Sequence, residues 1–176
     1  MNERVELSVF YPYPTEKVWH ALTDRRILNT WMMNNDFEPH LGHKFKFENH
    51  SLPGIKTVIH CEVVELDKPK RLAYTWQDEI TSEPTLVIWT FTTVEGGTQL
   101  RLKHLQRYAA ISVRDRHRFN QINNSHNLYQ QTITFHRHSP VSLHQIIKDE
   151  LTLGDRSSFL DWHYRLNHKL LEVLTH

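Results

Sequence analysis

Apolar and polar side chains alternate in a series of short segments of this chain, and this period of two constrains the fold more than any other feature. Successive side chains of a strand point to opposite faces, so each segment presents one apolar and one polar face. The apolar positions are Val5, Leu7 and Val9; Phe45 and Phe47; Leu72, Tyr74 and Trp76; Val87, Trp89 and Phe91; and Leu100, Leu102 and His104, and residues 58–66 add a stretch rich in β-branched side chains. The pattern predicts about six antiparallel strands in a sheet that is covered on one side only.

Two short helices are expected directly after the first strand. Pro12 and Pro14 end that strand, Thr15 stands where an N-cap belongs, and Asp24 can cap a second helix. The apolar faces would be formed by Val18, Trp19 and Leu22 and by Ile27, Leu28 and Trp31. Further along, Glu95, Gly96 and Gly97 predict a hairpin turn.

The last segment of the chain predicts one long helix. Residues 158–174 contain neither glycine nor proline, and apolar side chains recur at helical spacing at Phe159, Trp162, Leu166, Leu170 and Val173. A helix of this length spans roughly 25 Å at 1.5 Å per residue, enough to cross a sheet. We therefore expect an α+β fold in which a curved antiparallel sheet wraps around this helix, as a single domain over residues 1–176.

Composition excludes several classes of partner. The formal charge is only +1, which provides no global field for nucleic acid, and no apolar run is long enough to span a membrane. The single cysteine, Cys61, excludes a disulfide within the chain and suits a reducing compartment. We expect a cytoplasmic protein, a monomer or weak dimer, without a nucleic-acid partner.

Large rings on like-facing positions form the candidate site. If the sheet wraps the helix, they meet in its interior, where they form either a dense core or a pocket for a small apolar ligand anchored by His104 or Tyr74. The predicted pocket residues are Phe45, Phe47, Tyr74, Trp76, Trp89, Phe91, His104, Phe159, Trp162 and Leu166.

The sequence gives weaker support for a metal site or a catalytic nucleophile than for the aromatic site. The chain has 14 histidines, and His136 and His138 could share a strand face with His163 nearby, but no second cysteine or helical His-x-x-x-His supports a metal site. His60 and Cys61 are neighbours on a predicted strand, so they point to opposite faces and cannot form a dyad. We expect no catalytic residue, no metal and no cofactor; a general acid–base role for His104 stays open.

The segment 107–157 is a divergent connection between the last strand and the helix. Its first part, 107–138, holds five arginines and four histidines against one acidic residue, Asp115. We expect this part beside the pocket mouth or at a self-association surface, loosening as its histidines gain protons between about pH 5 and 7.

Several motifs resemble one known superfamily. Residues 9–14 (VFYPYP) and 17–24 (KVWHALTD), followed by Trp31, are similar to the opening of SRPBCC (START-like) proteins. Residues 62–66 (EVVEL) and 69–72 (PKRL), then 89–91 (WTF) and 96–98 (GGT), resemble the branch of the activator of heat-shock-protein-90 ATPase. The resemblance covers residues 5–104 and, loosely, the last helix.

This resemblance implies a helix-grip fold and leaves three functions open. Members of the superfamily include lipid and hormone binders, cyclases and chaperone-activating domains, so the fold alone assigns no activity. We expect a small-ligand-binding protein without catalysis. The alternatives are a chaperone-activator-like interaction module, which would bind a chaperone or another protein, and a cyclase- or hydrolase-like enzyme that uses His104.

Overall fold

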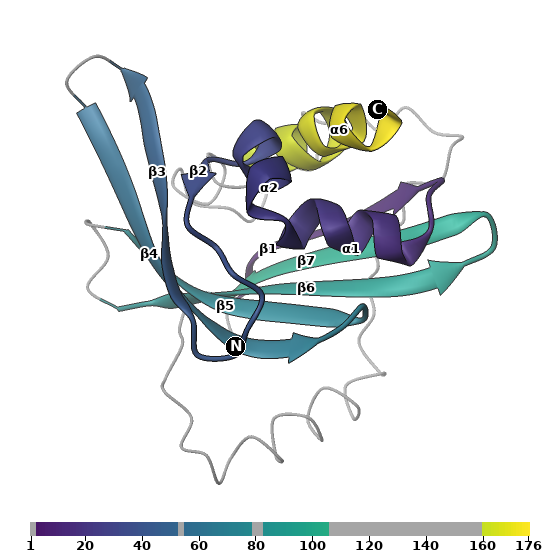
Figure 1. Cartoon of the computed structure of the whole chain (residues 1–176), viewed down its shortest axis with the longest axis horizontal. Helices are drawn as coiled ribbons and strands as arrows, with labels where there is room; N and C mark the ends of the chain where they lie inside the picture. The colour runs from purple at the N-terminus through teal and green to yellow at the C-terminus, as the bar shows by residue number, and fades with distance from the viewer. Residues whose placement is uncertain (1–2, 53–54, 79–82, 106–159) are drawn as a thin grey trace, which may run out of the picture.

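The computed structural model describes residues 3–52, 55–78, 83–105 and 160–176, and its strands form one antiparallel sheet (Figure 1). The strands are β1 (Glu3–Tyr11), β2 (Asn34–Asn35), β3 (Lys44–Leu52), β4 (Ile55–Asp67), β5 (Arg71–Asp78), β6 (Thr85–Val94) and β7 (Gly97–Leu105), in the order β1-β7-β6-β5-β4-β3-β2. The six predicted strands are confirmed. The seventh, β2, has two residues and is too short to show alternation in the sequence.

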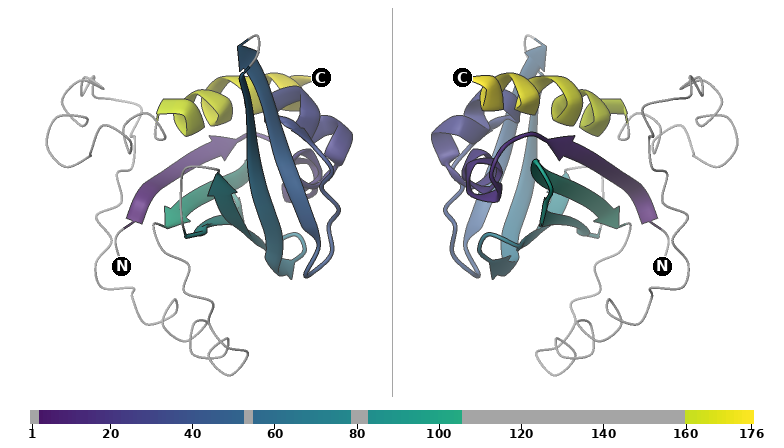
Figure 2. Two further views of the ribbon diagram at one scale, coloured as in Figure 1. Left: turned by 90° about the vertical axis from the view of Figure 1, so that its left-hand side faces the viewer. Right: turned by 90° about the vertical axis from the view of Figure 1, so that its right-hand side faces the viewer.

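The sheet curls around the C-terminal helix. In Figure 2, β3 and β4 stand beside this helix, while β1, β6 and β7 lie beneath it. The helix runs from residue 160 to 175 and includes η1 (Arg165–Leu170) and α6 (Leu171–Thr175). Trp162 contacts Trp76 and Trp89 of the sheet, each at a ring-centroid distance of 5.5 Å. The predicted helix-grip architecture is therefore confirmed.

The two short helices follow β1 as predicted, but their N-terminal caps differ. Asp24 caps α2 (Arg25–Trp31), because its carboxylate accepts hydrogen bonds from the backbone N–H groups of Arg26 and Ile27. In α1 (Thr15–Thr23) the cap position is Pro14, so the prediction for Thr15 was wrong. The Thr15 hydroxyl is buried and instead lies 2.7 Å from the hydroxyl oxygen of Thr93, which ties the helix to β6.

The C-terminal helix widens into a π-helical turn at η1. The Tyr11 hydroxyl donates a 2.6 Å hydrogen bond to the Leu166 carbonyl, which thus has a partner outside its own helix. In a regular α-helix, side chains four residues apart are rotated by about 40° around the helix axis relative to one another. A wider π-helical turn reduces this rotation, so residues at this spacing stay on one face. The side chains buried at this spacing are Trp162, Leu166, Leu170 and Leu174, and Val173, which the sequence pattern favoured, is only partly buried.

The turn between β6 and β7 depends on two glycines. Gly96 has φ of +78°, which favours a residue without a side chain. At Gly97, a Cβ atom would lie 2.1 Å from the Tyr11 carbonyl oxygen of β1. The hairpin can therefore approach the end of β1 only with glycine at this position.

The outer face of the sheet also carries a buried apolar patch. Ala73, Leu86, Ile88 and Leu105 are each less than 8% exposed, although they alternate with side chains that face the helix. We call these four residues, with Val64 packed against them, the outer-face patch. The prediction of a sheet covered on one side only is wrong here, because alternation on β6 gives way to a run of buried residues from Thr85 to Trp89.

The expectations for the connection 107–157, including its Arg- and His-rich part, fall on residues outside the described ranges. Its assignment to the same single domain stays a prediction.

Candidate functional site

Aromatic side chains from four strands and the C-terminal helix meet between the sheet and that helix. The ring of Trp76 on β5 lies between Phe47 of β3 and Trp162 of the helix, with centroid distances of 5.6 and 5.5 Å. Tyr74 joins Phe45 and Phe47 at 5.5 and 6.3 Å. The rings meet at tilted or edge-to-face angles, the arrangement that aromatic quadrupoles favour. This layer of rings, which we call the aromatic layer, consists of Phe45, Phe47, Tyr74, Trp76, Trp89, His104 and Trp162.

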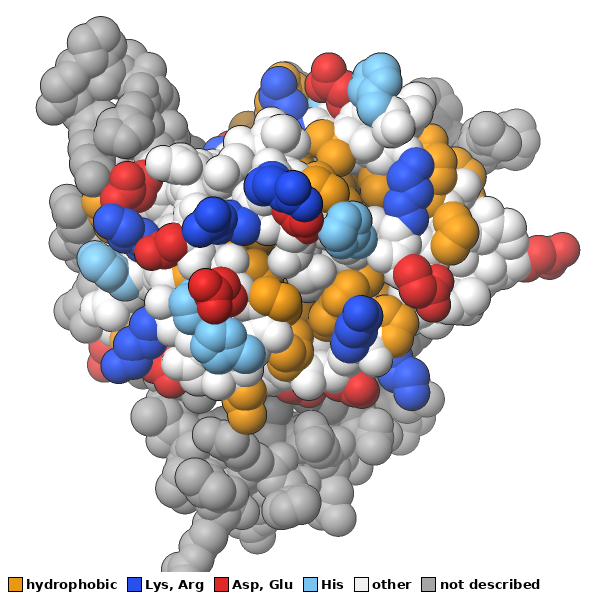
Figure 3. All heavy atoms as spheres, viewed as in Figure 1, with side chains coloured by type: hydrophobic (Ala, Val, Ile, Leu, Met, Phe, Trp, Pro, Cys, Tyr) orange, Lys and Arg blue, Asp and Glu red, His pale blue; other side chains and the backbone are white. Residues whose placement is uncertain are grey.

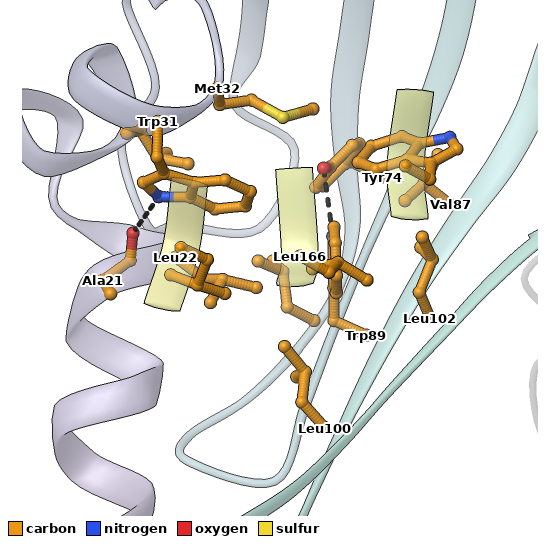
Figure 4. Close-up of a cluster of buried hydrophobic side chains, with 14 of the residues drawn as sticks. Ala21, Leu22, Trp31, Met32, Tyr74, Val87, Trp89, Leu100, Leu102 and Leu166 are labelled. Atoms are coloured by element: carbon orange, nitrogen blue, oxygen red, sulfur yellow. Dashed lines mark hydrogen bonds between the residues drawn. The ribbon is translucent and has the colours of Figure 1, made fainter. Parts of the chain in front are cut away.

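Two of the polar groups buried in the aromatic layer are hydrogen-bonded to each other. The indole N–H of Trp89 donates to the Tyr74 hydroxyl at 3.0 Å (Figure 4). Burial raises the pKa of the Tyr74 hydroxyl far above its usual value. The hydroxyl therefore stays protonated, and the ring that carries it packs against the two phenyl rings of β3.

His104 is held by Thr85 on the neighbouring strand. The Thr85 hydroxyl donates its proton to the Trp76 carbonyl, and its oxygen lies 2.8 Å from His104 Nε2. Since the only hydroxyl proton is engaged, Nε2 carries the hydrogen and donates to Thr85. The ring is only 2% exposed and packs edge-on against Trp76 and Trp162. This is the environment of a hydrogen-bonded core histidine.

The interior that the described residues enclose contains a small cavity. A cavity of about 10 Å³ lies beside the aromatic layer, which is roughly room for one water molecule. Its walls come from both short helices, the loop after them and three strands, and the lining residues are Leu22, Leu28, Trp31, Met32, Phe37, Phe47, Tyr74 and Trp89. Figure 4 shows Met32, Leu22 and Leu166 around the Tyr74–Trp89 pair.

The sequence-predicted pocket residues do not all join the aromatic layer. Phe91 is buried but packs against Trp19 of α1, with ring centroids 5.1 Å apart. Leu166 is fully buried in the helix, and Phe159 lies outside the described residues. Trp76 is only partly buried, so the aromatic layer reaches the surface at this residue.

Sequence reasoning missed part of the cavity wall. Leu28 and Trp31 were expected on the apolar face of α2, but nothing connected that face with the pocket. Met32 and Phe37 follow α2 in segments without clear periodicity. Only the tertiary structure, in which Phe37 packs against Phe45 of β3, brings them to the cavity.

Cys61 and His60 point to opposite faces of β4, as the alternation predicts. Cys61 is 5% exposed and faces the core, while His60 is exposed on the other face of β4. Burial raises the pKa of the Cys61 thiol well above its usual value. The thiol is therefore protonated near neutral pH and is a poor nucleophile.

The outer face of β3, β4 and β5 is hollowed but polar. An open hollow of about 390 Å³ is lined there by Asp36, Lys44, Phe45, Lys46, His60, Cys61, Glu62, Thr75 and Gln77. Charges of both signs are mixed on the surface that Figure 3 shows. Across the described ranges, no helix combines the length and apolar character needed to cross a lipid bilayer.

Of the histidines expected as the best metal candidates, only His163 belongs to the described residues. It is partly buried on the C-terminal helix, and burial, with a contribution from His168, lowers its pKa. His136 and His138 lie outside the described ranges.

Comparison with known proteins gives one family and several similar folds. The family model for activator of Hsp90 ATPase homolog 1-like protein matches residues 12–131. The protein MLL2253 from Mesorhizobium loti is 30% identical over 68% of this chain and 90% of its own, with a TM-score of 0.52. A Rhodobacter sphaeroides protein is 26% identical over 59% of this chain and 71% of its own, with a TM-score of 0.54.

A broader likeness of fold is found at lower identity. The protein CV1439 from Chromobacterium violaceum is 16% identical, and the match covers 97% of this chain and 95% of the other, with a TM-score of 0.62. No curated protein matches the chain.

Proposed function

Because the chain belongs to the family of activator of Hsp90 ATPase homolog 1-like proteins, we propose that it binds a small apolar or amphipathic molecule between its sheet and its C-terminal helix. The observation that carries this proposal is the aromatic layer. Trp162 of the helix meets rings from three strands, and a tyrosine hydroxyl lies among the rings of this layer. Such an interior combines apolar walls with a polar anchor, as small-molecule sites do.

Binding requires side chains to move, because the cavity of about 10 Å³ is far smaller than any organic ligand. Met32 lines this cavity, and a methionine side chain adapts readily through its three rotatable bonds. Trp76 is the member of the aromatic layer that reaches solvent. We therefore place the entrance beside Trp76 and the expanding volume next to Met32.

The first test is native mass spectrometry of the purified full-length chain, followed by titration with an apolar fluorescent probe. An apolar molecule should copurify, or the probe should bind and change tryptophan emission. The variant Met32→Ala enlarges the existing cavity and should raise probe affinity. Met33→Ala removes the adjacent methionine, which does not line the cavity, and should leave affinity unchanged.

Two outcomes would contradict the proposal. If both methionine variants bind the probe as the parent does, the probe does not enter the interior. If no apolar compound copurifies and no probe binds to the parent or to Met32→Ala, the interior is a core and not a site.

A second candidate is an interaction module that contacts a chaperone, and the small cavity favours it. A filled interior needs no ligand, and the family name points to an Hsp90-type ATPase as the partner to try. Adding the purified chain to such an ATPase should raise its rate of ATP hydrolysis; an unchanged rate would remove this candidate. Nothing in the described geometry favours an enzyme that uses His104, because its ring is buried against Thr85, Trp76 and Trp162.

A further inference from the structure

The loop between β2 and β3 gathers three metal-binding side chains on the surface. One ligand atom from each of Glu38, His40 and His43 lies within 4.8 Å of the other two. The Glu38 carboxylate is 3.7 Å from His40 Nδ1, and the two imidazole rings have centroids 4.6 Å apart. In Figure 3, histidine side chains lie directly beside an acidic one on this face of the molecule. The cluster lies on the outside and shares no residue with the cavity.

The backbone of this loop is fixed by hydrogen bonds to β4. The Gly42 N–H donates to the Val63 carbonyl at 2.8 Å, and the Val63 N–H donates to the His43 carbonyl at 2.9 Å. Gly42 has φ of +81°, which turns the chain sharply between the two histidines. The His43 N–H also donates to the His40 carbonyl, which closes the turn. The three side chains therefore project from an ordered segment.

The environment of His43 selects the tautomer that a metal ligand needs. Its Nε2 lies 3.0 Å from the Asp36 carbonyl oxygen, which can only accept, so Nε2 carries the hydrogen. In the neutral ring, Nδ1 then holds a lone pair. Histidines that bind metals commonly donate the N–H of their other ring nitrogen to a backbone carbonyl in this way. The ring is also parallel to Phe45, with an interplanar angle of 3°.

We propose that Glu38, His40 and His43 form a binding site for a divalent transition metal, with Zn²⁺ as the best match. Two imidazoles and one carboxylate are a donor set that Zn²⁺ accepts with a fourth position left for water. Bond lengths of about 2.0–2.1 Å place tetrahedral donors about 3.4 Å apart. The donor atoms must approach by roughly an ångström, which the exposed side chains of Glu38 and His40 can achieve by rotation. Metal binding uses the neutral imidazole of His40 and the carboxylate form of Glu38.

Calorimetric titration of the full-length chain with ZnCl₂ tests the site. Since the chain has 14 histidines, weaker sites elsewhere must be separated by variants. His40→Gln and Glu38→Gln each remove one ligand from an exposed side chain. Each should weaken the tightest Zn²⁺ site by more than about tenfold, because changing even a residue that only hydrogen-bonds to a metal ligand costs about that much. His20→Gln and His60→Gln remove exposed histidines outside the cluster and serve as controls that should bind as the parent does.

A second readout separates metal binding from a change in folding. Zn²⁺ should raise the melting temperature of the parent and of both controls, and raise it less in the ligand variants. Glu38 and His40 are exposed, so their removal should leave the metal-free melting temperature unchanged. If His40→Gln binds Zn²⁺ as tightly as the controls, or if the parent binds none, the proposal is wrong.

Discussion

At the scale of single residues, Asp24 shows how one side chain caps the N-terminus of a helix. Its carboxylate accepts from the backbone N–H of Arg26 at 2.8 Å and forms a 3.1 Å ion pair with the Arg26 guanidinium. The hydrogen bond from the Arg26 side chain is the main cause that lowers the pKa of Asp24 to about 2, and the backbone N–H bonds add to it. The pKa of the Asp24 carboxyl is lower in the folded protein than in the unfolded chain. The ionised carboxylate therefore stabilises the fold above about pH 4, and this stabilisation is lost as the pH falls through about 2.

We predict that Asp24→Ala lowers the free energy of unfolding by about 1 kcal/mol near neutral pH, because it removes the cap of α2. The difference from the parent should shrink as the carboxyl is protonated. Urea unfolding followed at several pH values between about 2 and 7 measures both effects. Asp24→Asn keeps a capping oxygen and should retain most of the stability without the pH dependence; a loss as large as that of Asp24→Ala would contradict the capping role.

At the scale of elements, one hydrogen bond links the end of β1 to the π-helical turn of the C-terminal helix. Tyr11→Phe removes the hydroxyl that donates to the Leu166 carbonyl, and both residues are at most 1% exposed. A buried carbonyl left without this partner should cost about 1–3 kcal/mol of unfolding free energy. Tyr164→Phe removes an exposed hydroxyl from the same helix and should change stability by less than about 0.5 kcal/mol. Equal losses in the two variants, measured by urea unfolding, would show that the Tyr11 bond does not matter.

The outer-face patch leads to a prediction about β6. Ile88→Ala should cost about 2–5 kcal/mol, because Ile88 is only 4% exposed. Thr92 lies on the same face of the same strand and is exposed, so Thr92→Ala should stay within about 0.5 kcal/mol of the parent. Thermal or urea unfolding measures the stability of both variants against the parent. If Ile88→Ala is as mild as Thr92→Ala, this face is solvated.

At the scale of the whole molecule, the C-terminal helix completes the core of the sheet. Leu166, Leu170 and Leu174 are each at most 1% exposed, and Trp162 joins residues from β5, β6 and β7. Helix and sheet should therefore unfold together. Tryptophan fluorescence and far-ultraviolet circular dichroism should give coincident unfolding transitions, whereas separate midpoints would mean that the helix detaches first.

Substitution of two adjacent leucines measures how much the contact between this helix and the sheet contributes to stability. Leu170→Ala removes a fully buried side chain and should cost about 2–5 kcal/mol. Leu171→Ala changes a side chain that is 40% exposed and should cost much less. Similar losses in urea unfolding would indicate that the helix is not seated on the sheet through Leu170.

The sequence by itself determined where six of the seven strands and the helices of the described residues lie. Alternation along β1, β3, β5, β6 and β7, and the cap at Asp24, depend on residues only a few positions apart, and such local signals can be read without knowing the fold. The aromatic layer was also predictable, since like-facing rings on neighbouring strands must meet once the sheet forms.

Features that arise from contacts between residues far apart in the sequence were decided only by the tertiary structure. The hydrogen bond from Tyr11 to the Leu166 carbonyl joins residues 155 positions apart, and the cavity wall forms where Met32 and Phe37 meet Tyr74 of β5. The volume of the interior follows from the fit of many side chains, which no local pattern in the sequence specifies. The grouping of Glu38 with His40 and His43 likewise depends on a turn that β4 fixes from outside the loop.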